Sequence, residues 1–96
     1  MKVGVLLPTF RDSAHDALAA AAEAASYSLD GVFAYDHLWP MGQPERPALA
    51  PFPVLAAVAA RIPNVSVGPL VARVGLVSTD DLVRQLRTLG ECAPGR

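Results

Sequence analysis

Three short apolar runs in this chain alternate with longer segments of helical character. The apolar runs cover Lys2 to Leu7, Val32 to Tyr35 and Val65 to Ala72. Short apolar runs bounded by proline or glycine are typical of buried strands. We therefore predict three strands. Pro69 is a cost to the third strand, because proline lacks the amide hydrogen that a sheet ladder uses.

Helices are predicted after the first two strands. The first opens between Asp12 and Asp16, where a capping residue and first-turn acids occur, and runs on alanine, leucine and glutamate to about Ser28. The segment from Pro40 to Pro51 is rich in proline and is predicted to be a long loop. A second helix is predicted from about Pro53 to Ala60, since proline is tolerated in a first helical turn.

A third helix follows the third strand and completes the pattern. It is predicted to begin near Thr79, whose hydroxyl can cap it, and to end at Gly90 or at the turn from Ala93 to Gly95. Strand and helix alternating three times predict parallel pairing through right-handed crossovers. Helices on one face would leave the other face bare, although parallel sheets are normally covered on both. We expect something further to cover it.

Length and composition limit the classes of function. The 96 residues allow one domain at most, and 52% hydrophobic with 18% charged residues indicates a folded chain whose core we expect to be shared with further sequence. A net charge of -1 without a basic stripe gives no support for nucleic-acid binding. No apolar segment has the roughly 20 residues of a membrane span, so no membrane role is expected.

The cysteine and histidine content gives no support for a disulfide or a metal site. Cys92 cannot form an internal disulfide, which favours a reducing, cytoplasmic setting, and we expect it to be an inert packing thiol. His15 is expected at the surface of the first helix. No spaced cysteine pair or paired histidines support a metal site. No glycine-rich fingerprint follows the first strand, so a Rossmann unit is disfavoured.

Candidate chemistry gathers at the carboxyl end of the second strand. Polar residues at that end of parallel strands are where α/β proteins usually carry their sites. His37 can exchange a proton near neutral pH, or simply cap a loop. Asp36 can orient His37 or make an ordinary cap or loop hydrogen bond, and Trp39 can face a planar ring or pack within its loop. Phe10 and Arg11, beyond the first strand, are weaker candidates for the same region.

Four sequence blocks in a fixed order carry a resemblance to a known family. They run from Gly4 to Pro8, from Asp30 to Pro40, from Val67 to Arg73, and from Asp81 to Leu89 with the tail Ala93 to Arg96. In this order and spacing they resemble the amino-terminal part of the bacterial-luciferase-like monooxygenase family, most closely its deazaflavin-dependent branch. That family folds as a (β/α)8 TIM barrel of about 250 residues. The resemblance thus implies three β/α units of a barrel that is incomplete at residue 96.

The resemblance also implies a cofactor and a reaction. Family members place an imidazole beside a flavin or deazaflavin ring, which implies coenzyme F420, or alternatively FMN, and hydride transfer with a small organic substrate. Catalytic roles are implied for His37 and Asp36. Contacts with the ring are implied for Asp36, Trp39 and the third-strand residues Leu70, Val71 and Ala72, where the family often has a non-proline cis peptide.

Two departures from the family pattern and two alternatives remain. Ser28 stands where the family commonly has glycine at a helix exit, and the later strands that help bind the cofactor's phosphate-bearing tail are absent. One alternative is a catalytically inactive fragment or partial barrel that must form a homo-oligomer or pair with a complementing chain. The other is a different (β/α)8 enzyme, such as a metal-dependent hydrolase, whose first strand would need paired histidines.

Overall fold

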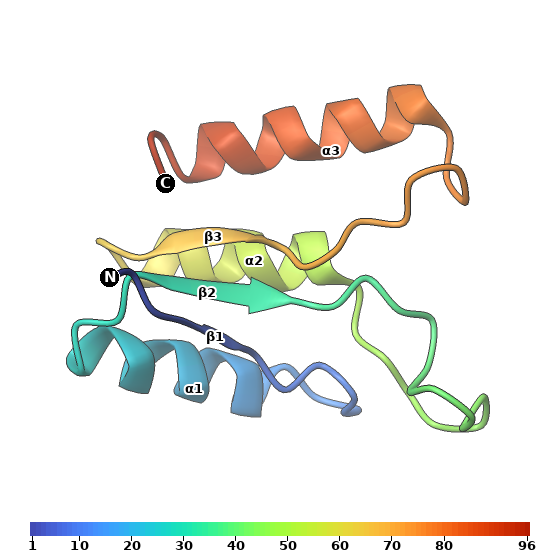
Figure 1. Cartoon of the computed structure of the whole chain (residues 1–96), viewed down its shortest axis with the longest axis horizontal. Helices are drawn as coiled ribbons and strands as arrows, with labels where there is room; N and C mark the ends of the chain where they lie inside the picture. The colour runs from blue at the N-terminus through green and yellow to red at the C-terminus, as the bar shows by residue number, and fades with distance from the viewer.

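The computed structural model describes all residues from Met1 to Arg96 and forms three successive β/α units (Figure 1). The elements are β1 (Gly4–Leu6), α1 (His15–Ser26), β2 (Gly31–Ala34), α2 (Pro51–Arg61), β3 (Ser66–Pro69) and α3 (Thr79–Cys92). The strands lie in the order β1-β2-β3, and both pairs are parallel. The predicted α/β class and the parallel pairing are confirmed.

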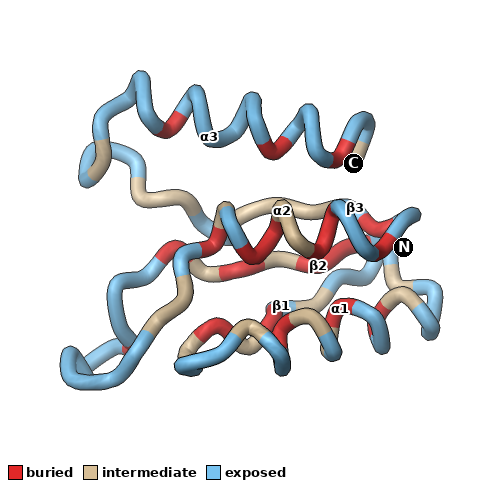
Figure 2. The backbone as a smooth tube through the Cα atoms, turned by 180° about the vertical axis from the view of Figure 1, so that it is seen from behind, coloured by how far each residue is buried: buried red, intermediate tan, exposed pale blue.

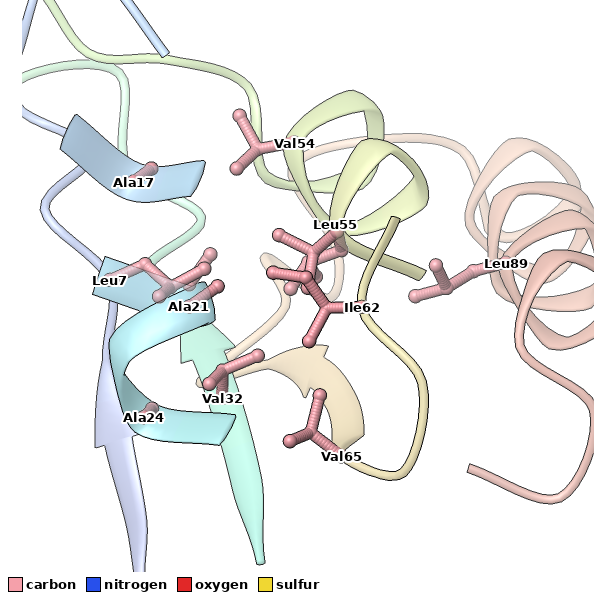
Figure 3. Packing of buried hydrophobic residues seen from close by; sticks show 12 residues of the cluster. Leu7, Ala17, Ala21, Ala24, Val32, Val54, Leu55, Ile62, Val65 and Leu89 are labelled. Atoms are coloured by element: carbon pink, nitrogen blue, oxygen red, sulfur yellow. The ribbon is translucent and has the colours of Figure 1, made fainter. Parts of the chain in front are cut away.

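The core lies between one face of the sheet and the helices α1 and α2 (Figure 3). Val32 and Ala34 of β2 are fully buried, as are Leu55 and Val58 of α2. Figure 2 shows that α3 is mostly exposed, with only a few buried residues along its length. None of the three helices has the length and apolar character that crossing a membrane would require.

Helix α1 presents a stripe of alanines to the core. Ala17, Ala21 and Ala24 are buried and recur at helical spacing, and their small side chains allow close packing against the sheet. The helix begins at His15, whose amide donates to the hydroxyl oxygen of Ser13 at 3.1 Å, and it ends at Ser26. The helix therefore begins within the predicted opening from Asp12 to Asp16 and ends two residues before the predicted Ser28.

The chain leaves α1 through a left-handed residue, Ser28, with a φ of 57°. The amide of Ser28 donates to the carbonyl of Ala25, and the amide of Leu29 donates to the carbonyl of Ala24. These two bonds define a Schellman turn, in which glycine is the usual residue at the left-handed position. The position where the sequence departs from glycine is thus one where the backbone favours glycine.

Helix α2 starts two residues earlier than predicted. Pro51 is its first residue and Pro53 lies within the same first turn, where backbone amides have no partner inside the helix. Neither proline therefore removes a helical hydrogen bond. The helix continues to Arg61, one residue beyond the predicted end.

Strand β3 is shorter than predicted, and Pro69 costs it less than expected. The amides of Ser66 and Leu70 donate to carbonyls of Asp30 and Ala34, so the amide positions of Val67 and Pro69 face away from β2. The missing hydrogen of Pro69 therefore removes no bond to β2. The strand ends at Pro69, and the Leu70-Val71 peptide that follows is cis, at the place that the resemblance implies.

The cap of α3 and the environment of Cys92 differ from the predictions, whereas one of the two predicted helix ends is confirmed. The capping residue is Ser78 rather than Thr79, because the Ser78 hydroxyl accepts the amide of Asp81 at 3.1 Å. Gly90 lies inside the helix, which ends at Cys92, directly before the predicted turn from Ala93 to Gly95. Cys92 is exposed, so its thiol is not the packing group that was predicted.

The last residue of the chain, Arg96, is hydrogen-bonded to the carboxyl end of α2 and to β3. The guanidinium of Arg96 donates to the carbonyls of Ile62 and Ala59 at 2.8 and 2.9 Å, which satisfies backbone oxygens at the end of that helix. The carbonyl of Arg96 accepts the amide of Val67 at 2.9 Å, on the outer edge of β3. The last residue thus ties α2 to β3.

The second face of the sheet has no helix on it. A Cβ atom built on Gly4, Gly31 or Gly68 would meet the ring of Phe33 at 2.5, 2.9 and 3.8 Å, so these positions share one face with Phe33. Leu6 pairs with Phe33 in the strand register and is partly exposed. We call this face, made by Gly4, Leu6, Gly31, Phe33, Ser66 and Gly68, the open face.

Candidate functional site

Three aromatic rings gather at the carboxyl end of β1 and β2. Tyr35 and His37 follow β2 and lie two residues apart, with ring centroids separated by 5.3 Å at an interplanar angle of 67°. Phe10 comes from the loop after β1, stacks on Tyr35 at 5.9 Å, and meets His37 edge to face at 6.1 Å. The imidazole of His37 is exposed, yet these two rings support it from the side.

Asp36 bonds to Arg73 and does not join the aromatic cluster around its neighbour His37. Its side chain is buried, with 5% of the residue exposed. One carboxylate oxygen accepts the backbone amide of Arg73 at 2.9 Å, and the other accepts Nε of Arg73 at 3.0 Å. Of the alternatives for Asp36, the structure has the loop hydrogen bond, and both oxygens serve Arg73 rather than His37. The pair joins the loop after β2 to the loop after β3.

The remaining candidate residues lie on the same two loops. Leu70 and Val71 are exposed and Ala72 is half-buried, directly before Arg73. Trp39 is exposed on the loop after β2 and is not part of the cluster of Phe10, Tyr35 and His37. Arg11 lies apart from them, since its guanidinium approaches the carboxylate of Asp16 on α1 at 3.5 Å.

The residues at this edge suit a planar ring better than a phosphate group. Leu70 and Val71 on the loop after β3 and Trp39 on the loop after β2 are exposed apolar residues, and His37 adds an exposed imidazole, a mixture that suits a flat heterocycle with polar edges. The guanidinium groups of Arg11 and Arg73 are each paired with a carboxylate, and that of Arg46, on the loop after β2, donates to the side-chain oxygen of Gln43. The loops after β2 and β3 thus carry exposed apolar side chains together with an exposed imidazole.

The candidate site is an open surface. None of the hollows in the molecule is lined by His37 or Asp36. The largest, of about 670 Å³, lies at the opposite end of the sheet among Lys2, Ser26, Asp30 and Asn64. A ligand at His37 would thus be bounded by this chain on one side.

Two residues of this site were missed in the sequence. Tyr35 could have been found, because residues two apart in an extended segment share a face, which links Phe33, Tyr35 and His37. Arg73 carried no such signal, since the contact with Asp36 joins positions 37 residues apart. Its role follows only from the way in which the sheet brings two loops together.

Fold and site together define the class: a small α/β domain with an open, three-stranded parallel sheet and a histidine-centred aromatic cluster at its carboxyl edge. Comparisons with protein-family models, with curated proteins and with solved structures found no match. The resemblance to the luciferase-like family therefore stays a prediction.

Proposed function

We propose that this chain provides the first three β/α units of a luciferase-like (β/α)8 barrel and one wall of its active site. The reaction is hydride transfer between coenzyme F420, or alternatively FMN, and a small organic substrate. The observation that carries the proposal is the position of His37. Its imidazole is exposed at the carboxyl end of the parallel strand β2. Phe33, four residues earlier in the chain, points to the open face, and in a closed barrel that face would be the interior.

His37 serves as the proton donor or acceptor in this proposal. When bound, the deazaflavin supplies or accepts the hydride, and the imidazole exchanges a proton with the substrate oxygen whose charge changes. Tyr35 and Phe10 limit the rotation of the imidazole by packing against it. Deazaflavins do not readily activate oxygen, so the F420 branch corresponds to a dehydrogenase or reductase.

The other residues position the ring. Leu70, Val71, Ala72 and Trp39 form apolar surface for it, and Asp36 holds the two loops in register through Arg73. This assigns Asp36 a positioning role instead of direct contact with the ring.

Cofactor binding tests the proposal. We expect the 96-residue chain to quench the fluorescence of F420 or FMN saturably, because the ring can lie on the apolar surface at Val71. Val71→Asp should weaken cofactor binding by about tenfold or more, because the new carboxylate would have to give up its hydration when the ring covers it. Val83→Asp is the matched control, because Val83 is an exposed valine on α3.

The role of His37 has its own control. In a barrel containing these units, His37→Ala should lower turnover by about 100- to 10,000-fold while cofactor affinity changes far less. His15→Ala, at an exposed histidine on α1, should change neither. Equal losses of turnover and affinity in His37→Ala would mark the residue as structural. Absence of quenching by both cofactors would favour the non-catalytic partial barrel.

A further inference from the structure

The largest hollow of the molecule lies at the amino end of the sheet, opposite the candidate site. Its volume is about 670 Å³, which is within the range of small-molecule sites. The end of α1 and the two connections that lead from α1 into β2 and from α2 into β3 line it. Figure 1 and Figure 2 show these segments together at one end of the molecule. The hollow is therefore formed within successive β/α units of this chain.

Both residues other than glycine that have a left-handed backbone line this hollow. Ser28, with a φ of 57°, precedes β2, and Asn64, with a φ of 67°, precedes β3. Glycine would adopt this backbone at a lower steric cost. Neither the hydroxyl of Ser28 nor the side-chain amide of Asn64 makes a hydrogen bond within the chain. Two polar side chains thus occupy positions that suit glycine, and both can donate to a ligand.

Charges of both signs complete the lining. Lys2 forms no salt bridge, and neither does Asp30. One carboxylate oxygen of Asp30 accepts the backbone amide of Val3 at 2.6 Å, which orients the side chain. A neutral ligand would use neither charge and a simple ion only one, whereas a zwitterion would use both. We propose that this hollow binds a small zwitterion of the α-amino-acid class.

Each end of the ligand has a partner in the hollow. The ammonium group of the amino acid pairs with the carboxylate of Asp30, and its carboxylate pairs with the ammonium group of Lys2. The hydroxyl of Ser28 and the amide of Asn64 donate further hydrogen bonds to it. All four side chains belong to exposed residues, so water screens the ion pairs and we expect a dissociation constant of about 0.1–10 mM. This binding is independent of the proposed hydride transfer, because no residue of the candidate site lines the hollow.

Nuclear magnetic resonance of the isotope-labelled 96-residue chain measures this binding and locates it. Titration with L-serine should shift the amide signals of Ser28 and Asn64 saturably and leave that of His37 unchanged. Glycerate lacks the ammonium group and ethanolamine lacks the carboxylate, so each should bind about threefold or more weakly. A lack of saturation at about 100 mM L-serine, or equal affinity for the three probes, would overturn the proposal.

Removal of either charge has a matched control. Asp30→Asn and Lys2→Met should each raise the dissociation constant for L-serine by about three- to tenfold, because one end of the zwitterion loses its ion pair. Asp12→Asn and Arg87→Met, at exposed residues outside the hollow, should bind L-serine like the wild type. Equal weakening by the two sets of variants would point to net charge alone and contradict a specific site.

A further variant keeps the test valid if the charge variants fold poorly. Ser28→Gly suits the left-handed backbone and therefore preserves the fold. It removes the hydroxyl from the hollow, so it should raise the dissociation constant for L-serine by about two- to fivefold. Unchanged affinity in Ser28→Gly, or in a folded Asp30→Asn, would show that L-serine does not bind in this hollow.

Discussion

Neighbouring residues at the end of β2 have different tasks. His37 is exposed and packs against Tyr35 and Phe10, whereas Asp36 is buried and bonds to Arg73. The sequence located both residues at the correct end of the sheet. It left their partners open, because a hydrogen bond between side chains depends on loops that are distant along the chain.

The ion pair between Asp36 and Arg73 should matter for stability. Asp36→Asn keeps the shape of the side chain but removes its charge and one of its two acceptor oxygens, so one bond from Arg73 is lost and the other loses its charge assistance. We expect the free energy of unfolding to fall by about 1–3 kcal/mol, measured by urea denaturation.

The pair formed by Asp81 and Arg84 supplies the comparison. Its atoms are only 2.7 Å apart, yet both side chains are more than half exposed. Asp81→Asn should therefore cost less than about 1 kcal/mol, since water and ions screen exposed pairs. Equal losses in the two variants would show that burial does not strengthen the Asp36 pair.

At the scale of elements, local sequence signals gave the order and approximate positions of all six segments. They succeed because strands and helices respond to apolar periodicity and prolines within a few residues. The ends were less well determined: α2 starts at Pro51 because both prolines fit one first turn, and Ser78 caps α3 in place of Thr79. Several residues near each end satisfy the same local rules.

The exit of α1 offers a prediction at this scale. Ser28→Gly should raise the free energy of unfolding by about 0.5–1 kcal/mol, because glycine adopts the left-handed φ of 57° without a steric cost. Thermal and urea denaturation of the purified variant would measure the gain.

The same substitution two residues earlier should have the opposite sign. Ser26 is the last residue of α1, and its hydroxyl donates to the carbonyl of Glu23 at 2.7 Å. Ser26→Gly should lower the free energy of unfolding by about 0.5–1 kcal/mol, since glycine favours the unfolded chain. Stabilisation by both variants would contradict a specific effect of the left-handed backbone.

At the scale of the whole molecule, Arg96 connects the chain end to α2 and β3. Arg96→Met keeps most of the apolar stem and removes the donors to Ile62 and Ala59. We expect a loss of about 1–3 kcal/mol, because two carbonyls lose a charged partner. The melting temperature should fall by roughly 4–8 °C for each kcal/mol.

Arg61 is the matched control for that prediction. It lies in the exposed last turn of α2 and makes no side-chain hydrogen bond to the helix end. Arg61→Met should therefore cost less than about 1 kcal/mol, the size of a favourable interaction with the helix dipole. A loss as large as that of Arg96→Met would point to charge alone and not to docking of the chain end.

The sequence by itself determined the alternation of strands and helices, the parallel sheet, and the end of the sheet at which polar residues gather. These features depend on the spacing of apolar residues within each element and on the short connections between successive elements, and both are local in sequence. The tertiary structure decided that Asp36 bonds to Arg73, that Arg96 closes α2, and that Phe33 lies on glycines of the open face. Such contacts join residues of different β/α units, and only the packing of those units brings them within reach.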